Sequence, residues 1–157
     1  MADDAHVPLD VKVLRSGEGA QVYTARGSVM AFKALAAQDD CDFSLMERTL
    51  PPGGRRPPAH RHDSCSEAYF VLNGTVSVVI DGHEHLLGTE DFVLVPRGVS
   101  HTFGNGGDEE ARLLVLHAPA LDAYFAGLHE LWNRDAPPSP DEERALMAQF
   151  GMRTGDD

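Results

Sequence analysis

Three histidines and one glutamate have spacings that suit a single metal-binding site. His60 and His62 are separated by one residue, Glu67 follows them closely, and His101 lies further along the chain. Imidazole nitrogens and carboxylate oxygens bind divalent transition metals, and four such ligands leave coordination positions free for water, a substrate or dioxygen. The set therefore predicts one divalent transition metal per chain, bound by these four residues, and indicates an enzyme.

Strands are the elements that would bring these four side chains together. Side chains alternate between the two faces of a strand, so His60 and His62 point the same way. Glu67 opens the next strand, and His101 lies on a later one. In a small closed barrel the inward faces of several strands meet on one axis, so ligands from three strands can surround one ion.

The same alternation predicts a substrate pocket. Residues that share a strand face with Glu67 or His101, or that end the last strand, should line it. They are Tyr69, Val99, Phe103 and His117. The first three suit a planar apolar substrate. His117 is a candidate base, with a histidine on the rim or surface as the alternative.

A histidine pair alone is weak evidence for a metal. His83 and His85 have the same spacing as the first pair, yet no suitably placed carboxylate or second histidine block follows them. We therefore expect no metal at that second pair. The first pair differs because the glutamate, the flanking glycines and the later histidine all accompany it.

The chain up to Ala118 has the pattern of an all-β protein, because short alternating runs are separated by turn residues. Asn73-Gly74 and Asp81-Gly82 favour tight hairpin turns. Ten short strands without intervening helices predict a barrel or sandwich. The predicted strands are Val11–Arg15, Gln21–Ala25, Val29–Leu35, Asp42–Leu50, Glu67–Leu72, Thr75–Ile80, His83–Leu87, Asp91–Val95, Val99–Phe103 and Ala111–His117.

Two helices are predicted after Pro119. Apolar residues recur at helical spacing from Leu121 to Trp132. A second helix should begin after Ser139, which is followed by Pro140 and by Glu142 at the position of a capping box, and it should end at Gly151. We expect both helices to pack on the barrel or on a partner subunit.

These residues resemble the two motifs of the cupin superfamily, G-x5-H-x-H-x3,4-E-x6-G and G-x5-P-x-G-x2-H-x3-N. The first matches from Gly54 to Gly74, and the second matches at Pro96, Gly98, His101 and Asn105. The opening glycine of the second motif falls on Glu90, and we expect Gly88 to serve that turn instead.

The resemblance implies an antiparallel jelly-roll β-barrel over residues 11–118, preceded by a flexible lead-in (1–10) and followed by a C-terminal helical tail (119–157). It also implies His60, His62, Glu67 and His101 as metal ligands, and a homodimer. The chain looks most like small single-domain bacterial cupins similar to quercetin dioxygenase, some of which accompany aromatic polyketide pathways.

Composition limits the partners. The formal net charge of −12 disfavours nucleic acid and anionic membranes, and no apolar run is long enough to span a bilayer. Arg55, Arg56 and Arg61 flank the histidine pair and are interpreted as solvated loop residues, with an anionic substrate as the alternative. The acidic N-terminus lacks the apolar core of a signal peptide, and we expect a cytoplasmic protein whose cysteines, Cys41 and Cys65, are reduced.

Three functions remain open. A dioxygenase would use iron to bring a small oxygenated aromatic or enol-type substrate to dioxygen, with Glu67 as both ligand and proton acceptor. A redox-neutral isomerase, cyclase or decarboxylase would use the same ligands with Zn, Mn or Ni to polarise a carbonyl. A non-catalytic small-molecule binding module is the third. Cys65 has the strand parity of Glu67 and could approach the metal, but we expect it to be a spectator in a loop.

Overall fold

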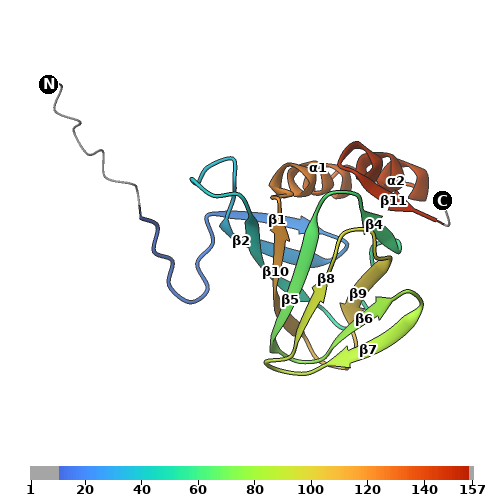
Figure 1. Cartoon of the computed structure of the whole chain (residues 1–157), viewed down its shortest axis with the longest axis horizontal. Helices are drawn as coiled ribbons and strands as arrows, with labels where there is room; N and C mark the ends of the chain where they lie inside the picture. The colour runs from blue at the N-terminus through green and yellow to red at the C-terminus, as the bar shows by residue number, and fades with distance from the viewer. Residues whose placement is uncertain (1–10, 156–157) are drawn as a thin grey trace, which may run out of the picture.

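The computed structural model describes residues 11–155, so the predicted lead-in over 1–10 lies outside the described residues. Two antiparallel sheets face each other, and two helices lie side by side across one end of them (Figure 1). The first sheet has the strand order β1-β2-β3-β10-β5-β8 and the second has β11-β4-β9-β6-β7. The strands are β1 (Gln21–Ala25), β2 (Ser28–Ala34), β3 (Ser44–Leu50), β4 (His60–His62), β5 (Ser66–Asn73), β6 (Val76–Ile80), β7 (His83–Leu87), β8 (Phe92–Val95), β9 (His101–Asn105), β10 (Ala111–Ala118) and β11 (Met152–Thr154).

The predicted antiparallel jelly-roll barrel with two C-terminal helices is confirmed. Inward and outward residues alternate along the central strands, as in β3, where every second residue from Ser44 to Leu50 is buried. On β5 the predicted faces are also correct, because Tyr69 and Val71 are fully buried and Phe70 is exposed. The inward side chains of both sheets form one apolar core around the predicted site.

Of the two predicted hairpin turns, one is confirmed and one is wrong. Asp81 and Gly82 both have positive φ and join β6 to β7, as predicted. The Asn73-Gly74 hairpin is wrong, because β5 and β6 belong to different sheets and this turn carries the chain from one to the other. Gly74 is still required there: its φ is +78°, and a Cβ would lie 2.7 Å from a backbone carbonyl oxygen.

One predicted strand is wrong. Val11–Arg15 forms no strand, since no strand within residues 11–155 pairs with it, and Val11 is 85% exposed. Gly88 serves the turn before β8, because its carbonyl accepts the backbone N–H of Asp91 at 3.1 Å and its own N–H donates to the Asp91 carboxylate at 2.8 Å. Glu90 takes the left-handed conformation (φ 70°) where the motif has glycine.

Both helices begin and end close to the predicted residues. α1 (Asp122–Trp132) buries Tyr124, Phe125 and Leu128 against the barrel. α2 (Pro140–Gln149) has the predicted capping box between Ser139 and Glu142. Neither helix, nor any other in residues 11–155, has the length and apolarity needed to cross a bilayer.

Candidate metal centre

The four predicted ligands meet at one buried point inside the barrel. His60 of β4 pairs directly with His101 of β9 in one sheet, while Glu67 enters from β5 in the opposite sheet. Side chains of His60, His62, Glu67 and His101 are all buried, and one ligand atom from each lies within 4.8 Å of the others. Ligands at about 2.1 Å from a shared ion are up to about 4.2 Å apart, so small side-chain adjustments would complete the coordination sphere.

Backbone carbonyls hold two of the imidazoles in the orientation that metal ligands need. The Nδ1–H of His60 donates to the carbonyl of Pro58 at 2.7 Å, and that of His101 donates to the carbonyl of Val99 at 2.9 Å. Both rings therefore direct Nε2 inward. Histidines that bind metals typically donate their other ring N–H to such a carbonyl or carboxylate. The donor set thus fits a divalent transition metal.

The charges inside the site keep Glu67 ionised. Burial opposes ionisation, but nearby His117 and hydrogen bonds from His101, His117 and His62 outweigh it, so the pKa of Glu67 lies well below its usual value. Burial, reinforced by the proximity of His101, lowers the pKa of His60 to about 3. A neutral imidazole and an ionised carboxylate are the forms that bind metal.

His117 lies beside the candidate metal ligands, not on the rim or surface. It is 2% exposed, and its Nε2 is 3.1 Å from Oε1 of Glu67, while His62 and His101 contact Oε2. His117, which lies on β10, thus contacts the carboxylate oxygen of Glu67 that His62 and His101 leave free. His117 orients Glu67, and its expected role as a base stays a prediction.

A small cavity adjoins three of the four candidate ligands, His60, His62 and Glu67. Its free space is about 20 Å³, which is room for about one water molecule. Phe103 and His117 line it as predicted, whereas Tyr69 packs behind the site against His101 and Phe103, and Val99 precedes β9. The other lining residues are Arg26, Arg48, Pro57, His60, His62, Glu67, Leu121, Tyr124, Phe125 and Met152.

Two arginines in this cavity were missed by sequence reasoning. Arg48 shares the inward face of β3 with Met46 and Leu50, and Arg26 occupies the turn between β1 and β2. Arginine is almost never fully buried without a partner. A charged residue at an inward position of an alternating strand was the signal that could have identified Arg48.

Cys65 does not belong to the cluster of candidate metal ligands. Its thiol donates to the backbone carbonyls of Ser66 and Pro119, each at 3.3 Å, and burial raises its pKa to about 12. Cys41 and Cys65 are both free thiols. Cys65 is therefore a buried structural thiol, as expected for a spectator.

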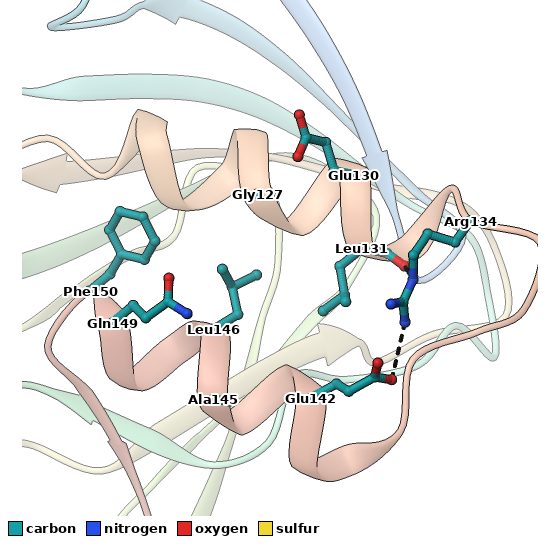
Figure 2. A pocket seen from close by; sticks show the side chains of 9 residues that line it. All are labelled: Gly127, Glu130, Leu131, Arg134, Glu142, Ala145, Leu146, Gln149 and Phe150. Carbon is teal, nitrogen blue, oxygen red and sulfur yellow. Dashed lines mark hydrogen bonds and ion pairs between the residues drawn. The ribbon is translucent and has the colours of Figure 1, made fainter.

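A larger hollow, which lies on the two helices, is separate from this site. A groove of about 750 Å³ runs between α1 and α2, flanked by Leu131, Leu146 and Phe150, and the ion pair of Arg134 with Glu142 crosses one end of it (Figure 2). It shares no lining residue with the metal cavity. The candidate chemistry therefore belongs to the smaller cavity.

Comparison with known proteins agrees with the geometry. Residues 46–117, which contain all four ligands, match the family model described as a cupin domain. The fold also matches a predicted oxalate decarboxylase from Thermotoga maritima, with a TM-score of 0.59 and 22% identity over 69% of this chain and 99% of that one. Residues 46–117 form a cupin domain.

Two curated relatives share this cupin region. Quercetin 2,3-dioxygenase of Bacillus subtilis (strain 168) is 30% identical over 93 residues, which is 58% of this chain and 26% of that protein. Polyketide synthase CurC of Streptomyces cyaneus is 33% identical over 66 residues, which is 42% of this chain and 43% of CurC. The chain thus spans a quarter to less than half the length of these relatives.

Proposed function

We propose that this cupin is a metal-dependent enzyme, and specifically a dioxygenase that acts on a small oxygenated aromatic or enol-type molecule. The observation that carries the proposal is the convergence of four buried ligand atoms within 4.8 Å of one another. A named dioxygenase among the relatives supports the choice of reaction. Iron is the metal that we propose, with Mn, Ni or Zn as alternatives.

The metal, Glu67 and the aromatic residues of the cavity would have different roles in this reaction. A bound iron would supply an oxygen-binding Lewis acid with accessible redox states. Glu67 would hold the ion and accept a substrate proton, because its two carboxylate oxygens have different neighbours, with His62 and His101 at Oε2 and His117 at Oε1. Phe103, together with Tyr124 and Phe125 from α1, would exclude water from the reacting atoms.

Metal analysis and oxygen uptake test this proposal. Protein purified without chelator or affinity tag should contain one equivalent of metal, and His101→Ala should lose it. Full metal occupancy in that variant would contradict the ligand assignment. Glu67→Gln keeps an oxygen ligand but loses basicity, so the fully metallated variant should remain slow. Wild-type activity in metallated Glu67→Gln would remove the proton-transfer role.

A redox-neutral isomerase, cyclase or decarboxylase is the second candidate. The small size of the cavity favours it, because space for about one water molecule leaves little room for an aromatic substrate beside dioxygen. Turnover without oxygen at the aerobic rate would select this candidate over the dioxygenase. Ligand binding without turnover under either condition would indicate a binding module.

The assembly and location of the protein are also proposals. We propose a homodimer, although α1 buries Phe125 and Leu128 within its own chain and offers less apolar surface than its sequence indicated. The exposed apolar side chains of Phe70, Phe92 and Leu94 on the outer face of β5 and β8 are the better support for it. We further propose a cytoplasmic location, which suits two free thiols.

A further inference from the structure

Among the residues that the structure describes, Arg48 is a buried charge without a carboxylate partner. It is 3% exposed, and its Nε and Nη2 donate to the hydroxyl of Ser28 at 3.3 and 3.1 Å. Its guanidinium also lies 5.1 Å from the centre of the Phe103 ring. Within residues 11–155 Arg48 makes no ion pair, although a buried charge is costly unless it is paired.

Arg26, the other arginine that lines this cavity, has a carboxylate partner. Its guanidinium forms an ion pair with Glu143 of α2, and both side chains are buried. That pair attaches α2 to the turn between β1 and β2. Arg48 lies close enough to Arg26 for the second charge to help lower its pKa to about 10, after burial as the larger cause, so Arg48 remains protonated at neutral pH. Arg48 is thus the cavity cation that has no carboxylate partner among residues 11–155.

Charge balance indicates what would complete the site. Arg48 and the ionised Glu67 line the same cavity and offset each other, while Arg26 is offset by Glu143. With a divalent metal bound, the cavity would carry two uncompensated positive charges in a water-excluding environment. A bound anion would compensate them, and the planar guanidinium fork matches a carboxylate better than a halide or a neutral carbonyl.

We propose that Arg48 is the anion-binding residue of this pocket and that its ligand is a small organic carboxylate. This inference rests on the proposed function, because it assumes the metal. It narrows the substrate class from any oxygenated molecule to a carboxylic acid or its enolate tautomer. The limited free space favours a small acid over a polycyclic one.

Binding measurements test the proposal without an assay of activity. Protein loaded with Mn(II) is titrated calorimetrically with acetate, glycolate and salicylate, and with their uncharged amides. At least one carboxylate should bind more tightly than its amide, and Arg48→Met should weaken that carboxylate about 10- to 100-fold, the range for a hydrogen bond to a charged group. Amide binding should change little.

Two further variants make the result specific. Arg112→Met removes an arginine of the same sheet that pairs with Glu47, outside the cavity lining, and should leave carboxylate affinity unchanged. Arg48→Lys keeps the charge but not the fork, so it should fall between the wild type and Arg48→Met. If Arg48→Met does not fold, the carboxylate affinity of Arg48→Lys still tests the assignment.

The possible failures are distinguishable because metal content is measured in every sample. A wild-type protein that binds no metal refutes the proposed function, and the Arg48 assignment with it. Metal retained at one equivalent, with equal carboxylate affinity in the wild type, Arg48→Met and Arg48→Lys, refutes the Arg48 assignment alone. The same holds if no carboxylate in the series binds better than its amide.

Discussion

Acid should destabilise the metal-free protein through His60. Burial lowers the pKa of this histidine from 6.5 to about 3 in the folded chain. Below pH 6.5 the unfolded chain therefore binds a proton at His60 that the folded chain does not, and the free energy of unfolding falls as the pH falls. Between pH 6.5 and pH 5.0 the free energy of unfolding therefore falls by about 2 kcal/mol, which is about 1.36 kcal/mol for each of the 1.5 pH units.

This pH window separates His60 from two other shifted groups of the site. The pKa of His101 is raised, because its hydrogen bond to Glu67 outweighs burial, so its stabilisation is complete below pH 6.5 and is lost only as the pH rises. The pKa of Glu67 is lowered, so its stabilisation is lost only below its unfolded value of 4.5. Between pH 6.5 and 5.0, neither contributes a change.

The assay is urea unfolding of chelator-treated protein at pH 6.5 and 5.0, followed by the fluorescence of Trp132, the single tryptophan. His60→Gln cannot take up the proton and should lose about 2 kcal/mol less than the wild type across this interval. His85→Gln, at an exposed position, is the matched control and should behave as the wild type. Parallel losses in the wild type and His60→Gln would refute the reasoning.

Three further predictions concern metal, backbone and assembly. A metal ion at a hundredfold excess over its Kd adds about 2.7 kcal/mol to the free energy of unfolding. Chelation should therefore lower the Tm of the wild type by about 5–10 °C and leave the Tm of His101→Ala unchanged. Equal Tm shifts in the two proteins would contradict a metal site at His101. Gly74→Ala should lower the free energy of unfolding by about 2 kcal/mol or more, since the positive φ and a close backbone carbonyl both oppose a Cβ. Gly82→Ala also has a positive φ but open space around it, so it should lower the free energy of unfolding by about 1 kcal/mol. Equal losses in urea unfolding would refute the steric clash at Gly74. Sedimentation should show a dimer of the 17.0 kDa chain that Phe92→Ser with Leu94→Ser weakens, and a wild-type monomer at micromolar concentration would contradict it.

The features predicted correctly from sequence are those with local causes. His60 and His62 share a face because side chains alternate along β4, and the box that begins α2 depends only on Ser139 and Glu142. The convergence of Glu67 and His101 was predicted from motif spacing. It depends on the two sheets facing each other, which the alternating pattern alone does not specify.

The features that were missed depend on tertiary partners. The sequence around Gly74 is typical of a hairpin, but which sheet β6 joins is decided by its pairing with β9, far away in the chain. β11 is only three residues long and exists because β4 offers it an edge. Val11–Arg15 has the composition of a strand but no such edge. The partners of Arg48 also come from other strands, so its isolation is visible only in the folded chain.

Substrate size and the position of the C-terminal helices are coupled in this fold. Leu121, Tyr124 and Phe125 belong to α1 or immediately precede it, and all three line the cavity beside the candidate metal ligands. Drug-sized ligands occupy pockets of about 300 Å³ or more, whereas the free space here is about 20 Å³. A flavonol-sized substrate would therefore require α1 to move away from the barrel. Because α2 packs on α1 and is attached to the β1–β2 turn by Arg26 and Glu143, that movement would also strain a buried ion pair. A small acid avoids most of this cost, so the charge of the cavity and its size independently favour the same class of ligand.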